Sequence, residues 1–475
     1  MKINGGFLVE LGLKPCKTFG ELLKLFNTSG DYTEQGIRHV VEGFINLKLP
    51  KNINTIHGDS PACLNLLKIY FDYETEHKKA DIKLRNENLP FNIFGAENIE
   101  QGAVDQMITA MRLPIAVAGV LVPDSHQGYN LPIGGILATE NQVIPNAVGV
   151  DISCSMKMSV FEEVSFPEKN NAFRMELKES LVKQTCFGVG LNEKKGLIHC
   201  GFESIVLENN LWNDIPMLKK YNIRKLAENQ IGTSGSGNHF VFFGNLDFKD
   251  GTPARLALLS HSGSRGVGYK IAKLYHDLAC KNFDNKGFQG WAWLDLDTDN
   301  GKEYWAAMNL CADFARISHD MIHYRINKFL GLEPSFTAFT NHNIAYRETH
   351  IINGKEMDLV VHRKGAVRAF KDEIGIIAGD MVHDSFIVKG KGNESSLCSC
   401  SHGAGRVMSR QSAKEKFTHK QMENILNEFG VELLGGGIDE SPMAYKDVYG
   451  VIDSQKDLVE IIGTFSPKIV KMAEQ

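Results

Sequence analysis

Six short polar segments, five of them containing glycine, constrain what this chain can fold into. They are Pro123–Gly135, Gly149–Met156, Gly232–Phe240, His261–Gly268, Asn341–Asn343 and Ser401–Arg410. Each carries His, Asp, Cys or Asn in a loop that follows a short apolar run, which is a pattern typical of strands and their ends. Strand-end loops are where α/β proteins place their ligands, and glycine lets the backbone approach an anion closely. Together the segments predict a metal site beside a phosphate site.

Short apolar runs and longer segments of helical character alternate along the chain. The expected strands are Ile115–Pro123, Ile133–Thr139, Ala147–Ile152, His239–Asn245, Ala254–Ser260, Met357–His362 and Ser385–Lys389. The expected helices are Tyr32–Leu47, Cys63–Glu76, Ile99–Leu113, Glu168–Lys183, Val267–Lys281, Lys302–Phe329, Gly403–Lys416 and Lys420–Phe429. This interleaving predicts a mixed α/β (α+β) fold. Because the candidate site residues span most of the chain, we expect one interlocked domain at residues 99–475, with a variable N-terminal region, residues 1–98, packed on it.

The composition excludes several classes of protein. With 43% hydrophobic and 23% charged residues, the chain is neither disordered nor fibrous. It has no apolar run near the ~20 residues that span a bilayer and no recognisable secretory signal, so we expect a cytoplasmic protein. A net charge of −5 provides no global basic excess for nucleic-acid binding, although a local basic groove is compatible with it. The nine scattered cysteines favour reduced thiols or metal ligands over disulfides.

Five residues form a candidate metal site. Asp151 and Cys154 are three positions apart at a predicted strand end, where both side chains can face one ion. His239, His261 and His342 follow predicted strands or turns and supply imidazoles. A thiolate with a carboxylate and imidazoles suits Mn, Fe, Co or Zn, and two ions sharing a bridging ligand would suit phosphoryl transfer. The alternative, a buried cysteine and structural histidines, is the better interpretation of any one residue and the poorer one for all five.

His402 is a candidate nucleophile. It precedes a loop that enters a predicted helix, with Arg406 and Arg410 one and two turns further on. Backbone N–H groups and these arginines would hold an anionic adduct, such as a phosphoryl or nucleotidyl group, on the imidazole. The alternative is a histidine at a helix N-terminus that makes only a local hydrogen bond.

Two other pairs have metal-like spacing. His319 and His323 repeat the H-x-x-x-H pattern of zinc proteases, but Asp320 replaces the usual glutamate and no third ligand follows, so we expect an ordinary helix surface. Cys398 and Cys400 are separated by one residue, which would strain a disulfide, and we interpret that pair as structural or incidental.

The ordered motifs resemble those of the RtcB-type RNA-splicing ligases from about Ile99 to the C-terminus. PDSHQGYNLPIGG is similar to the family's P-D-x-H-x-G-x-x-x-P-x-G-G, GVDISCSM to G-x-D-I-x-C-G-M, and GSGNHF to G-G-G-N-H-F. HSGSRGVG, HRKGA and HGAGRVMSR match as they stand, and DESPMAYKD is similar to D-E-x-P-x-A-Y-K-x. The resemblance implies an RtcB-like catalytic domain.

The resemblance also implies an activity. Members are Mn²⁺-dependent and use GTP to join RNA 2′,3′-cyclic phosphate or 3′-phosphate ends to 5′-hydroxyl ends, in RNA repair or tRNA splicing. Two Mn²⁺ ions would be bound by residues matching Asp151, Cys154, His239, His261 and His342. His402 matches the nucleophile that forms a covalent adduct with GMP. Broken tRNA or rRNA would be the substrate. We expect a monomer and leave an accessory activator open.

Further positions are assigned by the same resemblance. Asp124 matches an acid near the catalytic pocket, and Arg406 matches a phosphate-contacting arginine, so the catalytic set is His402, Asp124 and Arg406. The expected nucleotide-binding set is Asn238, Ser385, His402, Gly403, Ala404, Gly405, Arg406, Tyr445 and Lys471. Tyr445 would pack on guanine.

The chain departs from the family pattern mainly near the base pocket. Phe242 stands where the family usually has a glutamate that contacts guanine, and a phenyl ring cannot accept hydrogen bonds from guanine N–H groups. Ala378 and Val382 replace a proline and a glycine, and Ser155 replaces a glycine of the metal loop. We therefore expect a weaker preference for GTP over ATP.

Two other functions are compatible with the sequence. A metal-dependent phosphoesterase acting on RNA cyclic-phosphate ends would need the metal ligands but not His402. A non-catalytic RNA-end-binding homologue would be expected to have lost ligands, and none of the matched ligands is missing from the sequence.

Overall fold

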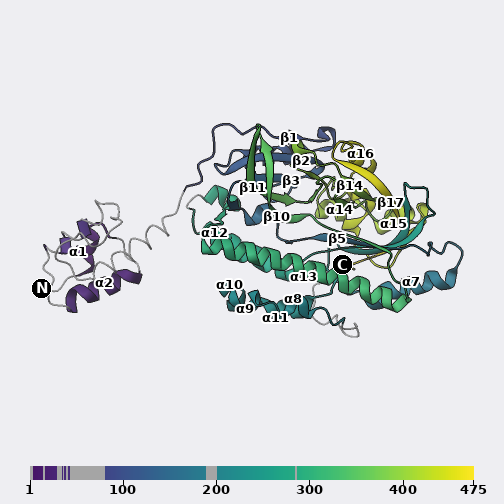
Figure 1. Cartoon of the computed structure of the whole chain (residues 1–475), viewed down its shortest axis with the longest axis horizontal. Coiled ribbons are helices and arrows are strands. Elements are labelled where there is room, and N and C mark those ends of the chain that lie inside the picture. The colour runs from purple at the N-terminus through teal and green to yellow at the C-terminus, as the bar shows by residue number, and fades with distance from the viewer. Residues whose placement is uncertain are drawn as a thin grey trace. The chain divides into compact units, whose positions relative to one another are not determined.

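The computed structural model describes residues 4–13, 17–28, 35, 37–38, 41–42, 81–188, 200–283 and 286–474. The chain forms two compact units, Met1–Ala80 and Asp81–Gln475 (Figure 1). In the first unit, α1 (Gly5–Glu10) is capped by the Asn4 side chain, which accepts from the N–H of Phe7, and α2 (Lys17–Thr28) follows. The helix expected at Tyr32–Leu47 is described at five positions, which are helical, and that at Cys63–Glu76 lies outside the described residues.

Two mainly antiparallel sheets form the centre of the second unit. One has the order β13-β14-β17-β6-β7-β5-β9, with β16 paired to β17, and the other has the order β1-β2-β3-β11-β10. The strands of the first are β5 (Ser155–Phe161), β6 (Phe240–Phe248), β7 (Arg255–Ser262), β9 (Phe336–Asn341), β13 (Ile374–Ile377), β14 (Ser385–Gly390), β16 (Glu432–Leu433) and β17 (Val459–Met472). Those of the second are β1 (Asn92–Ile93), β2 (Ala116–His126), β3 (Ile133–Thr139), β10 (Asn343–Ile352) and β11 (Lys355–Lys364).

Two short ribbons, β4–β8 and β12–β15, complete the strand pairing of the second unit. They are β4 (Gln142–Val143), β8 (Leu294–Asp295), β12 (Ala366–Arg368) and β15 (Ser399–Ser401). The β12–β15 ribbon matters for the site because β15 ends directly before His402.

Helices pack against the sheets and against one another. They are α5 (Gln101–Met111), α6 (Pro145–Val148), α7 (Asn171–Gln184), α8 (Ser204–Leu207), α9 (Leu211–Asp214), α10 (Pro216–Lys220), α11 (Ile223–Gln230), α12 (Arg265–Cys280), α13 (Asp299–Leu330), α14 (Arg410–Lys416), α15 (His419–Glu428) and α16 (Val448–Asp453). Short 3-10 turns include η2 (Ala96–Asn98), η5 (Glu394–Ser396), η6 (Ile438–Glu440) and η7 (Pro442–Ala444).

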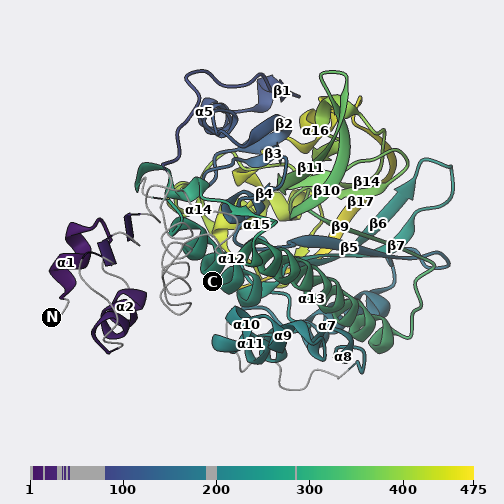
Figure 2. The ribbon, with the colours of Figure 1, turned by 60° about the vertical axis from the view of Figure 1, so that its left-hand side comes forward.

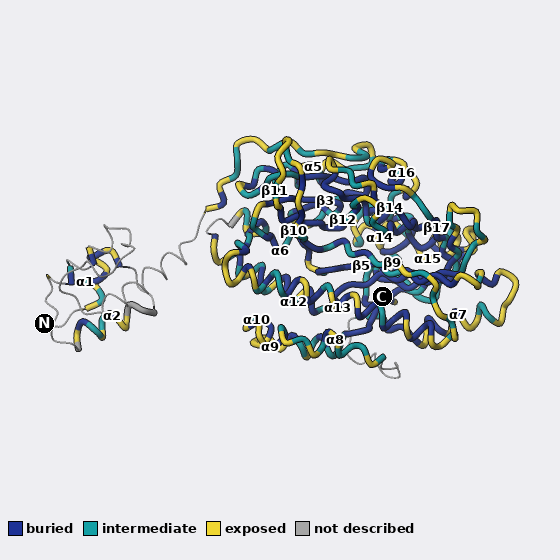
Figure 3. The backbone as a smooth tube through the Cα atoms, in the orientation of Figure 1, coloured by how far each residue is buried: buried dark blue, intermediate teal, exposed yellow. Residues whose placement is uncertain are grey.

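The longest helix, α13, lies beside α12 and packs against β5 and β7 (Figure 2). Thr298 caps its start by accepting from the N–H of Gly301, and Gly331 ends it at φ 66°, a conformation that glycine adopts without steric cost. The strands and the inner face of this helix are buried, whereas the connecting loops are largely exposed (Figure 3). Within the described part of the chain, no helix is both long and apolar enough to cross a membrane.

The expected mixed α/β fold is confirmed, with two local corrections. The apolar run Ala147–Ile152 is not a strand, because Pro145 opens the short helix α6, the chain turns at Gly149 with φ 102°, and β5 begins only at Ser155. The segment resembles a strand in sequence because the apolar side chains of Ala147, Val148 and Ile152 are buried in the core. The helix expected at Gly403–Lys416 begins at Arg410, because Gly405 has φ 77° and the N-terminal cap is Ser409.

Residues 81–98 lie within the second unit. The strand β1 pairs in parallel with β2, and Asn92 donates to the carbonyl of Ser395 at 2.7 Å. The packing of an N-terminal region on the catalytic domain stays a prediction.

Candidate active site

The five expected metal ligands converge at one end of the eight-stranded sheet. Asp151 and Cys154 lie in the loop before β5, and His239 directly precedes β6. His261 is on β7, and His342 lies between β9 and β10. Since β6, β7, β5 and β9 are consecutive neighbours in the sheet, strand register brings together residues that are nearly 200 positions apart in sequence.

The donor atoms of this cluster, which we call the Cys154 cluster, are close together. The Sγ of Cys154 lies 3.1 Å from Nε2 of His261 and 3.4 Å from Nε2 of His239. The Nε2 atoms of His261 and His342 are 3.2 Å apart, and Nε2 of His239 lies 3.1 Å from Oδ2 of Asp151. This mixed set of sulfur, nitrogen and oxygen donors converging on one space is suited to a transition metal or zinc.

Protonation states in the cluster favour metal binding. The Nδ1 of His261 lies 3.1 Å from the carbonyl oxygen of Asn238, which can only accept, so Nδ1 carries the proton and Nε2 presents its lone pair to the cluster. Burial, then the charge of nearby histidines, lowers the pKa of His261 and His342 well below the usual value and keeps both rings neutral. Burial and the charge of Asp151 raise the pKa of the Cys154 thiol, a penalty that a bound cation would offset.

Two glycines let the backbone pass close to these ligands. A Cβ at Gly263 would lie 2.3 Å from Oδ1 of Asp151, and one at Gly235 would lie 2.4 Å from Nδ1 of His239. Gly235 also has φ 103°, which side chains rarely adopt. The glycines of these two segments therefore make room for the ligands.

His402 is fixed by Asp124. The Nδ1 of His402 lies 2.7 Å from Oδ2 of Asp124, and the same oxygen accepts from the backbone N–H groups of His402 and Gly403 at 3.1 Å each. Burial alone would raise the pKa of Asp124, but the charge and hydrogen bond of His402 lower it overall, so the group is a carboxylate. The carboxylate holds the proton on Nδ1 and leaves the lone pair on Nε2.

Two cavities meet at His402. The first, of about 270 Å³, is lined by residues that include Asn238, Phe240, Phe242, Gly403, Ala404, Gly405, Glu440 and Tyr445. The second, of about 620 Å³, is a cleft whose walls include Asp151, Cys154, His342, Asn343 and Lys364. His126, Asn238, His402, Arg406 and Arg410 line both. A group bound in the smaller pocket and a chain lying in the cleft would therefore both reach the same imidazole.

A charged network holds one wall of the smaller pocket. Arg406 lies 3.3 Å from Oε2 of Glu440, and its guanidinium stacks 5.1 Å above the Tyr445 ring. The Tyr445 hydroxyl donates to Glu440, which also pairs with Arg410. Arg410 in turn reaches Asp439 at 3.1 Å. Because each charge has an opposite neighbour, the Tyr445 ring is held rigidly at the pocket edge.

Of the other residues expected near the nucleotide, some line or support the smaller pocket and one does not. Phe242 lines the smaller pocket and stacks on Phe240 at 3.9 Å between centroids. Ser385 supports the pocket loop, since its Oγ accepts from the N–H of Gly379 at 3.0 Å. Lys471 is not brought to the pocket: its Nζ donates to the carbonyl of Leu181 at 3.0 Å, at the C-terminal end of α7. Met472 lines the pocket instead, because successive side chains of β17 alternate between the faces of the sheet.

The expectation of a helix surface at the H-x-x-x-H pair is wrong. His319 and His323 are buried on the inner face of α13, and the Oγ of Ser260 lies 2.7 Å from a ring nitrogen of each. Burial lowers the pKa of His319 to about 3. The pair is a neutral polar contact between α13 and β7, and no metal-ligand group among the described residues contains it.

His126 and Lys364 are among the cavity residues that sequence reasoning missed. His126 lines both cavities, and burial lowers its pKa to about 4. Lys364 lines the cleft, its Nζ donates to the Tyr129 carbonyl at 2.5 Å, and burial lowers its pKa to about 8. His126 belongs to the PDSHQG motif and Lys364 to the HRKGA motif, so the sequence match marks both residues. The sequence does not show that their side chains face the cavities.

Comparison with known proteins decides the family. A family model described as tRNA-splicing ligase RtcB matches residues 106–472. The chain belongs to this RtcB family. It is 30% identical to RNA-splicing ligase RtcB homolog 1 of Entamoeba dispar, over 80% of this chain and 84% of that protein. It is 31% identical to RNA-splicing ligase RtcB of Escherichia coli K12, over 80% of this chain and 97% of that protein. It is 28% identical to tRNA-splicing ligase RtcB of Methanococcus maripaludis, over 79% of this chain and 91% of that protein.

Proposed function

We propose that the protein is an RNA ligase that joins 2′,3′-cyclic phosphate or 3′-phosphate ends to 5′-hydroxyl ends through a covalent His402–GMP adduct, in RNA repair or tRNA splicing. The observation that carries this proposal is the 2.7 Å contact between His402 and the buried Asp124, at the junction of the two cavities. Membership of the RtcB family, whose curated relatives are named as RNA-splicing or tRNA-splicing ligases, supports the same activity.

In the first step, Nε2 of His402 attacks the α-phosphorus of GTP. A nitrogen–phosphorus bond forms, the bond to the bridging oxygen breaks, and pyrophosphate leaves with the electron pair. Asp124 accepts the hydrogen bond from Nδ1–H throughout and stabilises the positive charge that develops on the ring. Arg406 and the backbone of the loop at residues 403–405 line the pocket and would neutralise the phosphate.

The later steps use the cleft. Water attacks the phosphorus of a cyclic phosphate, the bond to the 2′-oxygen breaks, and a proton from the water passes to that oxygen, which leaves a 3′-phosphate and a 2′-hydroxyl. An oxygen of the 3′-phosphate then attacks the phosphorus of the adduct, and the nitrogen–phosphorus bond breaks to release His402. The 5′-hydroxyl of the second RNA then attacks the 3′-phosphorus, and GMP leaves. Lys364 and Arg410 line this cleft and would contact RNA phosphates.

The Cys154 cluster fits the two Mn²⁺ ions expected of the family. Its sulfur, imidazole and carboxylate donors converge on one space, and Oδ1 of Asp151 and Nδ1 of His342 are buried without a hydrogen-bond partner among the described residues. Asp151, Cys154, His239, His261 and His342 would hold the ions. Bound Mn²⁺ would polarise phosphoryl oxygens and offset the negative charge of the transition state.

A phosphoesterase acting only on cyclic-phosphate ends is less well supported. It would use the cleft and the metal ligands but would have no need for the Asp124–His402 pair or for the Tyr445 pocket. A non-catalytic RNA-end-binding protein would not need to keep the complete ligand set together.

The test is adduct formation with labelled nucleotides. Purified protein is incubated with Mn²⁺ and GTP or ATP labelled in either the α- or the γ-phosphate. We expect retention of the α-label alone, in a bond that is acid-labile and alkali-stable, as a phosphoramidate is. His402→Ala should form no adduct and join no RNA ends, whereas His276→Ala, a control on α12 outside both cavities, should behave as wild type. Unchanged adduct and end joining in His402→Ala would overturn the proposal.

A further inference from the structure

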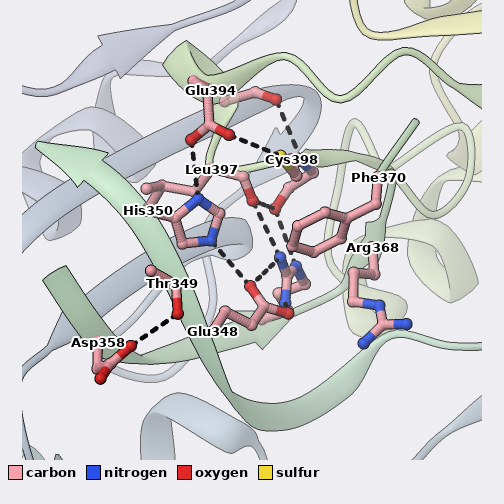
Figure 4. A network of polar contacts seen from close by, with 12 residues as sticks. Glu348, Thr349, His350, Asp358, Arg368, Phe370, Glu394, Leu397 and Cys398 are labelled. Atoms are coloured by element: carbon pink, nitrogen blue, oxygen red, sulfur yellow. Dashed lines mark hydrogen bonds and ion pairs between the residues drawn. The ribbon is translucent and has the colours of Figure 1, made fainter. Parts of the chain in front are cut away.

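A second cluster of ligand-type side chains lies outside the two catalytic cavities. It consists of His350 on β10, Glu394 in η5 and Cys398 just before β15, and we call it the Cys398 cluster (Figure 4). Each residue offers one donor atom, and the three atoms lie within 4.8 Å of one another. His350 and Cys398 are buried, whereas the Glu394 side chain is 49% exposed. The chain thus brings an imidazole, a carboxylate and a thiol together near the surface.

The distances between these donor atoms suit an ion with tetrahedral coordination. The Nδ1 of His350 is 3.1 Å from Oε2 of Glu394, and the Sγ of Cys398 is 3.8 Å from Oε1 of Glu394. Bonds of about 2.0–2.3 Å from zinc to nitrogen, oxygen and sulfur, at tetrahedral angles, place the donors roughly 3.3–3.8 Å apart. Small side-chain adjustments would therefore complete three bonds to one ion.

The outer contacts of His350 are those of a metal-binding histidine. Its Nε2 lies 3.1 Å from Oε2 of Glu348, which leaves Nδ1 facing Glu394 and Cys398 (Figure 4). Glu348 is held in turn by Arg363, through two hydrogen bonds of 2.8 Å. A carboxylate that accepts from the far ring nitrogen fixes the tautomer and orientation of a ligating histidine. Arg363 also donates to the carbonyl of Leu397 at 2.9 Å, so it links this support to the turn that carries Cys398.

The cluster demands a positive charge. Both ring nitrogens of His350 face carboxylates, Nδ1 that of Glu394 and Nε2 that of Glu348. The Glu348–Arg363 pair is neutral by itself, which leaves the charge of Glu394 to be balanced at this point. A proton on His350 can balance it, and a divalent ion bound by Glu394 and a Cys398 thiolate can do so equally well.

We propose that His350, Glu394 and Cys398 bind one divalent ion of the Zn²⁺ or Co²⁺ type, with water as the fourth ligand. Glu394 also lines a surface cavity of about 410 Å³, which gives the ion and the water a route to the site. The ion ties the turn at residues 394–398 to β10. Because β15 follows this turn and ends directly before His402, the site is structural and stabilises the segment that carries the nucleophile.

Co²⁺ binding tests this proposal independently of ligation, because a thiolate bound to Co²⁺ gives a near-ultraviolet charge-transfer band. The probe is Co²⁺ alone, added to the metal-free full-length protein. Cys154→Ala removes the thiolate of the Cys154 cluster, so we expect one remaining thiolate-bound Co²⁺ per chain. The band should disappear in Cys154→Ala/Cys398→Ser and persist in Cys154→Ala/Cys200→Ser, the matched cysteine control.

A milder variant keeps the test decisive if the double variant does not fold. In the Cys154→Ala background, Glu394→Gln changes a half-exposed side chain and should weaken Co²⁺ binding at least about tenfold. The thermal midpoint of Cys154→Ala should rise on addition of Zn²⁺, and this rise should shrink with Glu394→Gln. Absence of the Co²⁺ band in folded Cys154→Ala, or a band unchanged by both Cys398→Ser and Glu394→Gln, would overturn the proposal and leave His350 holding a proton.

Discussion

The Cys154 cluster and the Cys398 cluster use the same kinds of side chain in opposite ways. In the Cys154 cluster the imidazoles of His261 and His342 are neutral, and the donor atoms converge beside a cleft of about 620 Å³. Oδ1 of Asp151 is buried there without a hydrogen-bond partner among the described residues. In the Cys398 cluster both nitrogens of His350 face carboxylates, and Arg363 balances Glu348.

This difference matches the roles that we propose, chemistry for the Cys154 cluster and stability for the Cys398 cluster. Unpaired buried donors and acceptors are costly, and they persist where a ligand or an ion will satisfy them. Polar groups that are paired with neighbouring charges stabilise the fold and are not available to a substrate. The comparison predicts that changes in the Cys154 cluster remove activity with little loss of folding, and that changes in the Cys398 cluster do the reverse.

The largest effect is expected for Cys154→Ala. Without the thiolate, no nearby side chain can replace the central ligand of the cluster, so Mn²⁺ binding and His402 adduct formation should fall at least about 10³-fold while the fold is kept. Metal analysis, the adduct assay and circular dichroism measure the three quantities. Cys398→Ser is the counterpart, and its adduct formation should fall less than about tenfold. Equal losses in both variants would contradict the division between the clusters.

Asp124→Asn should lower the rate of adduct formation about 10²–10⁴-fold. The amide can donate to Nδ1 of His402 and so favour the tautomer with the proton on Nε2, which cannot attack phosphorus. Single-turnover kinetics with labelled GTP measure the rate. Asp358→Asn, which alters a carboxylate paired with Thr349, serves as the control and should be silent. A wild-type rate in Asp124→Asn would show that the carboxylate does not select the tautomer.

Phe242→Glu should raise the ratio of GTP to ATP adduct formation about 10- to 100-fold. Phe242 lines the pocket beside Tyr445, and a carboxylate there can accept from two guanine N–H groups that adenine lacks. Tyr445 stacks on either purine, so the wild type should use ATP measurably. Phe242→Gln provides a control of the same size without the charge. If the wild type is strictly GTP-dependent and the glutamate changes nothing, other residues read guanine.

The smallest effect is the alkaline stability contributed by His350. Its folded pKa of about 10 lies above the unfolded value near 6.5, so protonation stabilises the fold fully below about pH 6.5. That stabilisation is lost as the pH rises through about 10. The urea midpoint of chelator-treated wild type should therefore fall over this window.

His350→Gln should flatten the alkaline decrease, and Zn²⁺ should flatten it in the wild type if the ion replaces the proton. His419→Gln, on the surface of α15, controls for the loss of any histidine. Identical pH profiles for wild type and His350→Gln would remove His350 from the charge balance of the Cys398 cluster.

Much of the catalytic site was predictable from local sequence. The sequence pattern puts each of the five ligands at the end of an expected strand, and strand ends in a sheet lie close together. The structure keeps them at strand ends, although the residues before β5 and β6 precede their strands instead of following one. The five ligands are Asp151, Cys154, His239, His261 and His342. His402 was selected because arginines follow it at helical spacing. That spacing was partly misleading, since residues 403–409 form a loop and Arg406 is held by Glu440.

Other features depended on contacts between distant segments. His402 and Asp124 are 278 residues apart, and their pairing requires β15 and β2 to meet at the centre of the fold. His319 and His323 have the spacing of a helix surface, but the position of α13 on β7 buries them. Lys471 and Met472 differ by one residue, and only the register of β17 decides that Met472 faces the pocket.

The sequence by itself therefore determined the fold class, the chemistry of the ligands and the candidate nucleophile, because these depend on residue type and local conformation. Tertiary structure alone decided which side chains face a cavity and which charged side chains pair with one another. The Cys398 cluster illustrates the limit. The spacing of Cys398 and Cys400 predicts no site, because His350 and Glu394 reach Cys398 only through the packing of β10 against the turn before β15. Burial and strand register, which arise from the whole chain, fix such contacts.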